Sequence, residues 1–520
     1  MVVGKVANEK SFAKLFKQNS IKFLMPKKDL EFVKKVQKEI TLLSNASALL
    51  GWDQQVYMPK KASQDRAEQA TILDGILHKK ITDDKFYKAV LSLSKSKLPN
   101  DDARTIEILK RDLGKARKLP NEFIEELSKT TSQAFDAWQE ARERKDFKIF
   151  LPHLKKIVEL KKKQAKYIGL AGHTYNSLLD SFEEGMTVEE LKPKFEKLKI
   201  ELIELIKKIE NSEKYKTQKN IFENYTFSND KQIIMSKEIA EKIGLKKDIS
   251  RVDISTHPFT IRLGTKDVRI TTNVRTDPLF SLLSTMHEAG HALYEIQMPE
   301  KFKYTALMDT PSLGIHESQS RFWENMVGRN KPFWKYYSKQ FKSEFGLKEK
   351  EEEIFSSVNH IFPGKIRIES DEVHYCLHVI LRFEIEIDLI AGKISVEELP
   401  KIWNNKMKEL FGVTPKNDAE GVLQDVHWSG GSFGYFPTYA LGTIYASQIY
   451  EQMKKEIPKI EEEIEKGNFE KMQKWLGEKI HSQGRKYLAE DLIKKVCGEG
   501  LNPEVYIKYL TKKFSEIYGF

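Results

Sequence analysis

Hydrophobic residues recur every three or four positions along most of the chain, with charged residues between them. Such a spacing places apolar side chains on one face of an amphipathic α-helix. Asp29 is the expected N-cap of one helix. Thr187 is the expected N-cap of another, with the Glu190 side chain bonding back to it. The two stripes are Leu30, Val33, Val36, Ile40 and Leu43, and Leu191, Phe195, Leu198, Leu202 and Leu205. Because the pattern continues to Tyr518, it predicts a mainly α-helical fold.

One segment departs from this helical period. Between Phe259 and Val274, hydrophobic and polar residues alternate on both sides of the polar turn Gly264-Thr265-Lys266-Asp267. A period of two residues is typical of a half-buried β-strand, so the segment predicts a β-hairpin. We expect a small antiparallel β-sheet beside the helix that carries the metal-binding motif described below.

The chain contains no internal repeat, no low-complexity segment and no linker rich in Pro, Gly or Ser. One large helical domain over residues 27–520 is therefore expected rather than a string of modules. Residues 1–26 are rich in lysine and end at Pro26, and we interpret them as an N-terminal extension.

The composition is that of a packed, soluble protein. Hydrophobic residues make up 40% of the 520 positions, which excludes a wholly disordered chain. Cys376 and Cys497 are too few and too far apart for a disulfide framework or a cysteine zinc cluster, and they indicate a reducing cytoplasm. No apolar run approaches the roughly 18–20 residues of a membrane helix, and the N-terminus lacks a signal-peptide pattern.

The formal net charge is +11, from 87 Lys and Arg against 76 Asp and Glu. Lys and Glu are interleaved almost everywhere, which is typical of solvated helix faces rather than of a surface that binds nucleic acid. We therefore expect neither a nucleic-acid partner nor a membrane partner.

A metal-binding motif lies on the helix that should begin at Asp277-Pro278. The hydrophobic stripe of this helix is Leu279, Leu283, Met286, Gly290 and Leu293. His287 and His291 are four residues apart, so both imidazoles project from one side and can bind one cation, with Glu288 beside them. In a chain with 12 His and 76 acidic residues, this H-E-x-x-H pattern is expected by chance only about 0.04 times. The alternative interpretation is a pair of core or surface histidines.

A hydrolytic zinc site needs three protein ligands and an open position for water. Gln297 stands where a metzincin would place its third histidine. Glu317, 30 residues after the first histidine and on what should be the following helix, is the predicted third ligand; the alternative is an exposed glutamate at a helix start. Two histidines and one glutamate favour Zn²⁺, which Co²⁺ could replace. With Glu288 accepting a proton from water, peptide-bond hydrolysis is the expected reaction.

Several short segments follow one another in a fixed order. They are His257-Pro258-Phe259, Asp267-Val268-Arg269-Ile270-Thr271, His287-Glu288-Ala289-Gly290-His291, His316-Glu317-Ser318-Gln319, Ile366-Arg367-Ile368-Glu369-Ser370-Asp371-Glu372 and Gly421-Val422-Leu423-Gln424-Asp425-Val426-His427-Trp428. An N-terminal stretch reads Leu50-Gly51-Trp52-Asp53-Gln54-Gln55, then Met58-Pro59 and Arg66. In these segments the sequence resembles the thermostable carboxypeptidase (Taq-type) family of zinc metallocarboxypeptidases, from about residue 28 to residue 520. Ser370 stands where alanine is common in that family.

This resemblance implies a helical fold with a deep central active-site groove and a homodimer. It also implies an enzyme that releases single amino acids from the free C-termini of peptides, with broad specificity that disfavours C-terminal proline. An oligoendopeptidase of the same group of glutamate-ligand zinc peptidases is the nearest alternative, because it would use the same three ligands. A non-catalytic helical scaffold or nucleic-acid binder is the alternative from another class.

The resemblance also directs attention to further residues. Arg367 offers a planar two-donor fork that suits the terminal carboxylate of a substrate, or it forms a structural ion pair with Glu369 or Asp371. His427 is expected to donate a hydrogen bond to the substrate backbone or the oxyanion, and is otherwise a core histidine.

Two pairs of residues complete the predicted site. Tyr435 and Tyr439 lie four residues apart after a glycine-rich run, and each is either an oxyanion donor or a packed aromatic residue. His257 and Arg269 flank the predicted hairpin. They either close one end of the groove, and so restrict cleavage to the terminal residue, or serve only the architecture.

Overall fold

The computed structural model describes the backbone of residues 9–520 and the side chains of residues 27–520. The chain divides into two compact units. The smaller unit comprises the residues up to Lys118 together with Pro299–Asp309, and the larger unit comprises Leu119–Met298 and Thr310–Phe520. All of the predicted site residues lie in the larger unit.

Helices joined by short 3₁₀ turns build the smaller unit. They are α1 (Glu9–Val56), η1 (Lys60–Ala62), α2 (Ser63–Ile81), α3 (Asp84–Leu93), α4 (Asn100–Ala116) and η3 (Glu300–Phe302). The core of this unit is apolar: Val33 of α1 packs with Phe86 and Val90 of α3 and with Ile106 of α4. The first predicted stripe therefore faces a hydrophobic core, as its period requires.

The expected N-cap at Asp29 is wrong. Helix α1 begins at Glu9, so Asp29 lies inside it. Residues 9–25 contain neither Gly nor Pro, and their helix propensity continues the helix on the N-terminal side of Asp29. Residues 1–8 of the expected extension lie outside the described residues, and a domain boundary at residue 26 stays a prediction.

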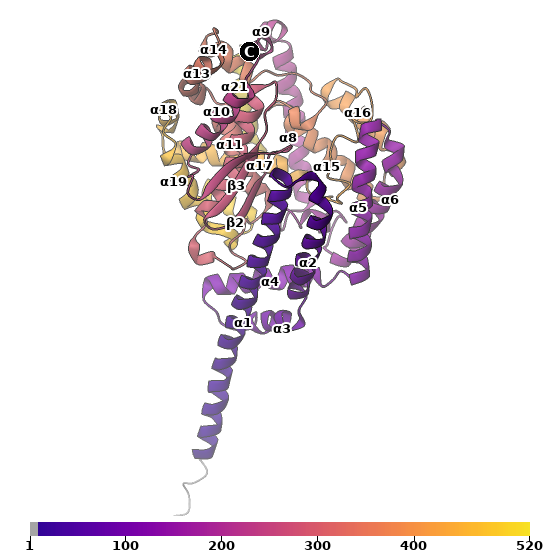
Figure 1. The fold of residues 1–520 in the computed structure, drawn as a ribbon, viewed down its shortest axis with the longest axis vertical. Helices are drawn as coiled ribbons and strands as arrows, with labels where there is room; N and C mark the ends of the chain where they lie inside the picture. Colours follow the sequence, from indigo (N-terminus) through magenta and orange to yellow (C-terminus); the bar gives the residue numbers. More distant parts are fainter. Residues whose placement is uncertain (1–8) are drawn as a thin grey trace, which may run out of the picture. The chain divides into compact units, whose positions relative to one another are not determined.

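Helices also dominate the larger unit, which confirms the predicted mainly α-helical class (Figure 1). They are α5 (Asn121–Arg144), α6 (Phe147–Ile168), α7 (Asn176–Leu179), α8 (Val188–Glu210), α9 (Glu213–Thr217), α10 (Asn229–Lys242), α11 (Pro278–Gln297), α12 (Leu313–Arg321), α13 (Lys331–Phe345), α14 (Glu351–Val358), α15 (Tyr375–Ala391), α16 (Leu399–Phe411), α17 (Pro437–Glu456), α18 (Ile460–Glu465), α19 (Glu470–Lys479), α20 (Ala489–Cys497) and α21 (Pro503–Tyr518). Short turns lie between some of them: η2 (Ile221–Asn224), the π-helical turn η4 (Phe322–Val327), η5 (Arg367–Glu369), η6 (Val396–Glu398) and η7 (His481–Lys486).

Helix α8 carries the second predicted stripe. All five of its stripe residues are buried, and Leu198 and Leu202 are fully excluded from solvent. The Thr187 hydroxyl accepts a hydrogen bond from the Glu190 amide at 3.2 Å, so the predicted N-cap is confirmed. The apolar face of α8 packs against α15 and α21, which explains why its period is so regular.

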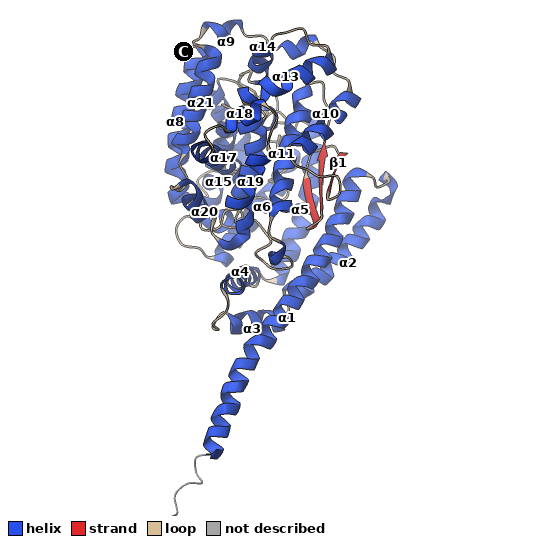
Figure 2. Cartoon of the chain, turned by 90° about the vertical axis from the view of Figure 1, so that its left-hand side faces the viewer, coloured by secondary structure: helices blue, strands red, loops and turns tan. Residues whose placement is uncertain are grey.

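In the part of the chain that the structure describes, three strands form one sheet: β1 (Ser250–Ile254), β2 (Thr260–Gly264) and β3 (Asp267–Thr272). Figure 2 shows these strands in red. Strands β2 and β3 are the predicted hairpin, closed where Gly264 pairs with Asp267. The sheet is mixed rather than purely antiparallel as expected, because β1 pairs with β3 in parallel. Strand β1 spans only five residues, which is too short for its alternation to be distinctive.

Helix α11 lies at the centre of the contacts that position the site. Strands β2 and β3 and helices α10 and α12 pack against it, and α12 packs in turn against α17. A Cβ atom at Gly290 of α11 would collide with the main-chain carbonyl of Gln319 on α12. A Cβ atom at Gly442 of α17 would lie 2.5 Å from Cγ of Glu317. The two glycines therefore let α12 approach both neighbouring helices closely.

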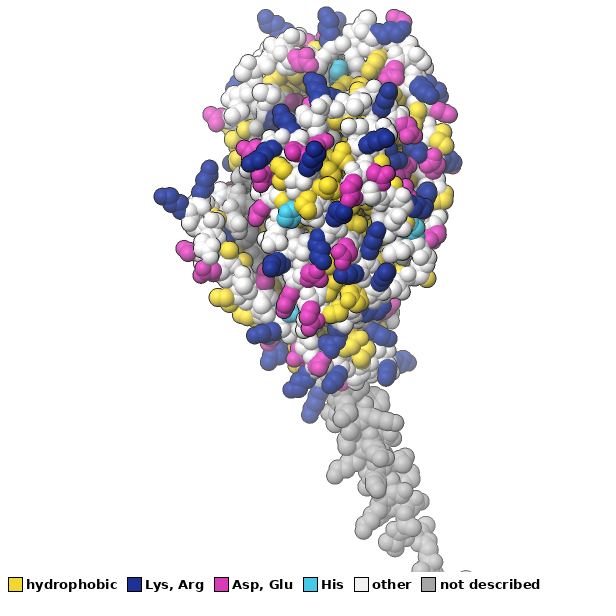
Figure 3. Space-filling model, turned by 90° about the vertical axis from the view of Figure 1, so that its right-hand side faces the viewer, with side chains coloured by type: hydrophobic (Ala, Val, Ile, Leu, Met, Phe, Trp, Pro, Cys, Tyr) yellow, Lys and Arg dark blue, Asp and Glu magenta, His cyan; other side chains and the backbone are white. Residues whose placement is uncertain are grey.

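The surface carries charges of both signs. Figure 3 shows basic and acidic side chains interspersed over the visible face, as the interleaved Lys and Glu of the sequence predict. The absence of a nucleic-acid partner stays a prediction. Among the helices that the structure describes, none is long and apolar enough to cross a bilayer. Cys376 and Cys497 form no disulfide, as expected.

Candidate active site

Helix α11 presents both motif histidines toward α12. It begins as predicted: the Asp277 carboxylate accepts a hydrogen bond from the Leu279 amide at 2.9 Å, and Pro278 occupies the first turn. The hydrophobic stripe of the helix is buried. The side chains of His287 and His291 are only 18% and 13% exposed, so both imidazoles are largely shielded from water.

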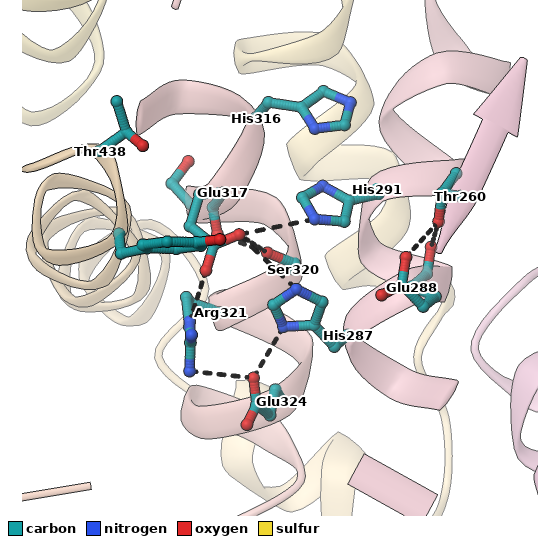
Figure 4. A network of polar contacts seen from close by, with 12 residues as sticks. Thr260, His287, Glu288, His291, His316, Glu317, Ser320, Arg321, Glu324 and Thr438 are labelled. Carbon is teal, nitrogen blue, oxygen red and sulfur yellow. Dashed lines mark hydrogen bonds and ion pairs between the residues drawn. The ribbon is translucent and has the colours of Figure 1, made fainter. Parts of the chain in front are cut away.

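Glu317 projects from α12 toward the two histidines (Figure 4). Its Oε2 atom lies 3.6 Å from Nε2 of His287 and 3.5 Å from Nε2 of His291. Donor atoms about 2.0–2.2 Å from one tetrahedral ion are separated by about 3.4 Å, so these spacings suit a shared metal ion. Within the described part of the chain, these three side chains are the group of His and carboxylate residues close enough to hold an ion. The predicted metal ligands are therefore brought together.

A shell of polar side chains holds two of the predicted ligands, Glu317 and His287, in place. Arg321 donates from Nε to Oε1 of Glu317 at 2.7 Å, and the Ser320 hydroxyl donates to Oε2 of Glu317 at 3.0 Å. Glu324 accepts a hydrogen bond from Nδ1 of His287 at 2.8 Å and lies 3.2 Å from Nη1 of Arg321. These contacts appear as dashed lines in Figure 4. Glu324 thereby turns Nε2 of His287 toward Glu317, as partners of metal-bound histidines commonly do.

Glu324 reaches His287 from the π-helical turn η4, which directly follows α12. Within this turn the Gly328 amide donates to the carbonyl of Trp323, five residues earlier, at 2.9 Å. A π-helical turn adds one residue to a helical turn and so changes which side chains face a neighbour; such turns are frequent at functional sites. This local irregularity thus carries a residue that contacts a predicted ligand.

Buried charges set the proton states of these groups. Burial alone would raise the pKa of Glu317, but the charges of Arg321 and His287 hold it well below its ordinary value. Burial would also raise the pKa of Glu324, but the charge of Arg321 and the hydrogen bond from His287 lower it to about 2. Burial opposes protonation of both histidines; it lowers the pKa of His291 to about 3, whereas the charge of Glu317 and the bond to Glu324 raise that of His287 to about 9. At neutral pH the metal-free His287 therefore holds a proton that a bound metal ion would have to displace.

Glu288 lies beside the ligands without joining them. It is 7% exposed, and the Thr260 hydroxyl of β2 lies 2.7 Å from its Oε2 atom and 2.9 Å from its main-chain oxygen. Burial raises the pKa of Glu288, and the neighbouring His287 opposes this only in part. A carboxylate with a raised pKa is a stronger base, which suits the predicted role of Glu288.

Arg367 lies in turn η5 and is 5% exposed. It pairs with Asp425 rather than with Glu369 or Asp371: its Nε and Nη2 atoms donate to Oδ1 of Asp425 at 3.1 and 2.8 Å. Arg382 donates from Nε to Oδ2 of the same carboxylate at 2.6 Å. Two guanidinium groups thus share one carboxylate, which leaves an excess of one positive charge among these three residues.

The structure brings His427, Tyr435 and Tyr439 together near Arg367. Nε2 of His427 lies 3.2 Å from the hydroxyl of Tyr439, and the ring centroids of the two tyrosines lie 5.2 Å apart. The guanidinium of Arg367 lies 4.7 Å from the ring centroid of Tyr439. Burial lowers the pKa of His427 to about 4, so its imidazole is neutral at pH 7. Burial and then the charge of Glu317 raise the pKa of Tyr435, so this phenol keeps its proton and can donate.

Tyr375, at the start of α15, connects the arginine pair to the metal ligands. The guanidinium of Arg321 lies 4.0 Å from its ring centroid, and its hydroxyl accepts a hydrogen bond from Nη1 of Arg367 at 3.4 Å. Arg321 in turn holds Glu317. The two groups of predicted residues are therefore parts of one continuous polar site.

Two predicted residues lie in the sheet region. Arg269 on β3 donates from Nε and Nη2 to the two carboxylate oxygens of Asp267, both at 2.8 Å. His257 is exposed in the loop between β1 and β2. Their part in closing a groove stays a prediction, as does the deep groove itself.

Comparison with known proteins identifies this arrangement. The family model of Carboxypeptidase Taq (M32) metallopeptidases matches residues 32–514. The chain belongs to this family. It is therefore a metallocarboxypeptidase, a hydrolase that acts on peptide bonds, and the resemblance stated from the sequence is confirmed.

Named relatives and solved structures agree with M32 membership. Carboxypeptidase 1 of Bacillus subtilis is 38% identical over 488 residues, which cover 92% of this chain and 97% of the relative. Thermostable carboxypeptidase 1 of Pyrococcus furiosus is 38% identical over 482 residues, or 92% and 96% of the two chains. The structure of Pyrococcus furiosus carboxypeptidase matches with a TM-score of 0.90 at 36% identity, over 94% of this chain and 99% of that one. The M32 carboxypeptidase from Deinococcus radiodurans matches with a TM-score of 0.91 at 34% identity, over 95% and 100%.

Several residues of the candidate site in this M32 carboxypeptidase were not predicted from the sequence. Arg321 and Glu324 follow Glu317 by four and seven residues, and this spacing could have indicated a shared helix face. Tyr375 and Thr260 reach the site from α15 and β2, and no sequence pattern marks them. Only the fold brings Thr260 to Glu288 and Tyr375 to Arg321 and Arg367.

Glu386 supports the segment 427–435 of this M32 carboxypeptidase. It is fully buried on α15 and accepts hydrogen bonds from Nε1 of Trp428 at 2.8 Å, from the Gly434 amide at 3.0 Å and from the Tyr175 hydroxyl at 2.5 Å. Burial raises its pKa to about 7, although these hydrogen bonds oppose the rise. One buried carboxyl thus anchors both ends of the segment.

Removal of the acceptor for His287 should weaken metal binding. We expect Glu324→Ala to raise the metal dissociation constant about 10- to 100-fold, because the imidazole loses the partner that fixes its orientation. Competition with a chromogenic chelator measures this constant. Glu349→Ala is the control, since Glu349 contacts Tyr225 rather than a predicted ligand. An unchanged constant in Glu324→Ala would show that Glu324 does not position the ligand.

The raised pKa of Glu386 predicts a pH-dependent stability difference. Between pH 4.5 and about 7 the folded protein keeps a proton that the unfolded chain releases, so this group's contribution to the free energy of unfolding falls as pH rises. The glutamine of Glu386→Gln does not titrate, so the variant does not lose this contribution to the free energy of unfolding. Relative to the wild type, its free energy of unfolding should increase across this window by up to about 3 kcal/mol, as measured by denaturant titration. A difference independent of pH would contradict the assignment.

Proposed function

We propose that this metallocarboxypeptidase is a zinc enzyme that releases single amino acids from the free C-termini of peptides. The observation that carries the proposal is the convergence of His287, His291 and Glu317 on one point, with Glu288 beside them. Two imidazoles and one carboxylate suit a borderline metal, so Zn²⁺ is the proposed ion and Co²⁺ a working substitute. When bound, the metal would activate water and polarise the scissile carbonyl.

Glu288 is the proposed general base. Its carboxylate is buried and its pKa is raised, which favours acceptance of a proton from the attacking water. The same group then passes that proton to the leaving amine, so that the base returns to its starting state. The Thr260 hydroxyl contacts Oε2, which leaves Oε1 of the carboxylate to face the reactants.

Neutral hydrogen-bond donors are proposed to stabilise the oxyanion. Tyr435 and Tyr439 are both partly buried phenols that keep their protons at neutral pH. The contact between His427 and Tyr439 supports a shared role, in which His427 either orients Tyr439 or donates to the substrate. A donor of this kind contributes roughly 2.7–4 kcal/mol to transition-state stabilisation.

Arg367 is proposed to recognise the terminal carboxylate of the substrate. The excess positive charge of Arg367 and Arg382 over Asp425 supports this, because a buried cation without a full counter-charge attracts an anion. His257 and Arg269 are proposed to limit the length of the substrate beyond that point. Broad side-chain specificity with proline disfavoured, a homodimeric state and a cytoplasmic location complete the proposal by resemblance.

Glu288→Gln should retain metal but lose most of its turnover. The amide keeps the shape of the side chain yet cannot accept the proton of water, so we expect kcat to fall at least about 100-fold, a typical share for general-base catalysis. Metal content by atomic emission and kcat on a blocked dipeptide provide the two readouts. Near-normal turnover in this variant would remove Glu288 from the mechanism.

Product mapping separates the proposal from an oligoendopeptidase. An N-blocked peptide should lose single residues from its C-terminus in mass spectra, and a chelator or C-terminal amidation should stop the reaction. Arg367→Ala should reduce the preference for free over amidated peptides about 10- to 100-fold, because the charged fork is lost. Internal cleavage of amidated peptides by the wild type would favour the endopeptidase. An unchanged preference in Arg367→Ala would mean that the carboxylate is recognised elsewhere.

A further inference from the structure

The hydroxyl of Thr260 makes a contact with Glu288 that the known chemistry of the site does not require. Its Oγ1 atom lies 2.7 Å from Oε2 of Glu288 and 2.9 Å from the main-chain oxygen of the same residue. Figure 4 shows Thr260 reaching from its strand to Glu288, on the side of α11 away from Glu317. A single hydroxyl therefore touches both the carboxylate and the backbone of one residue.

Strand pairing fixes the position of this hydroxyl. Thr260 pairs with Ile270 in the antiparallel ladder of β2 and β3, and Ile270 is fully buried. The Phe259 carbonyl accepts a hydrogen bond from the Thr271 amide at 2.9 Å, which anchors the start of β2. A β-branched side chain has few rotamers in such a strand. The hydroxyl thus reaches Glu288 from a rigid sheet rather than from a mobile loop.

The geometry suits a carboxyl group that gains and loses a proton. A hydroxyl carries one donor and two acceptor positions. While Glu288 is a carboxylate, the Thr260 hydroxyl donates to Oε2. Once Oε1 holds the proton taken from water, Oε2 becomes the carbonyl oxygen of the carboxylic acid and still accepts the hydrogen bond from Thr260. The contact therefore persists in both forms without movement of the side chain.

We propose that Thr260 is a positioning residue for the base of the hydrolytic reaction. It holds Oε2 of Glu288 against the sheet, so that Oε1 stays directed at the reactants throughout the proton transfer. This inference rests on the proposed function, in which Glu288 is the base. It assigns a role to strand β2 beyond architecture.

Substitution of Thr260 tests the proposal directly. Thr260→Val keeps the shape of the side chain and removes the hydroxyl, and we expect kcat to fall about 10- to 100-fold, the usual effect of losing a hydrogen bond to a charged group. KM and the metal dissociation constant should stay within about twofold, because neither the substrate nor a ligand loses a contact. Thr260→Ser should restore kcat to within about threefold of the wild type. If valine disturbs the strand, Thr260→Ala also removes the hydroxyl and can be compared with Thr260→Ser in the same way.

Thr285→Val supplies the matched control. Thr285 is a buried threonine on α11 whose hydroxyl contacts Thr272 of β3 at 2.9 Å, so the substitution removes a hydroxyl from the same helix–sheet junction without touching Glu288. Its kcat should stay within about threefold of the wild type. The metal-free forms of both valine variants should show similar melting temperatures. An equal fall of kcat in both variants would overturn the proposal, because the loss would then belong to the junction as a whole.

A double-mutant cycle with Glu288→Gln provides the sharpest result. If Thr260 acts through Glu288, then adding Thr260→Val to Glu288→Gln should change the residual rate by less than about threefold. A full additional loss in the double variant would contradict the proposal, as would wild-type kcat in Thr260→Val or failure of Thr260→Ser to restore it. Near-normal turnover of Glu288→Gln alone would instead refute the proposed base itself, so the two failures are distinguishable.

Discussion

The close approach of α11 and α12 is the constraint on which the site depends. Gly290 leaves room for the main chain of α12, and Gly442 leaves room for Glu317 on the other side. Because each glycine lacks a side chain, α12 lies against both helices, and Oε2 of Glu317 comes within 3.6 Å of both histidines. A methyl group at either position would collide with α12, so the helices would have to move apart. Helix packing, more than any loop, therefore builds the proposed metal site.

The same packing buries several charges, and their mutual pairing makes that burial tolerable. Arg321 lies between the carboxylates of Glu317 and Glu324, and each carboxylate also faces His287. Removing water from such groups is costly unless each finds a partner of opposite charge, and here α11, α12 and the turn η4 supply these ion pairs. Tyr375 extends this network to Arg367. The consequence is that the orientations of Glu317 and His287 are set before a metal or a substrate arrives.

Much of this site could be predicted from the sequence because its signals are local. Asp277-Pro278 starts the helix, and the spacing of His287 and His291 depends only on helical geometry. The parts that could not be predicted join residues far apart in the chain. Asp425 pairs with Arg367 across 58 positions, and one of 76 acidic residues cannot be chosen for that role without the fold. The short parallel strand β1 and the early start of α1 were not predicted for another reason. Neither segment has a distinctive hydrophobic period.

We propose that one metal ion is held by His287, His291 and Glu317. Crystals of the metal-loaded protein, measured at the absorption edge of the bound metal, would locate this ion. One anomalous peak is expected, about 2.0–2.2 Å from Nε2 of each histidine and from Oε2 of the glutamate. A peak bound by other residues, or one that leaves any of these three atoms outside coordination distance, would contradict it.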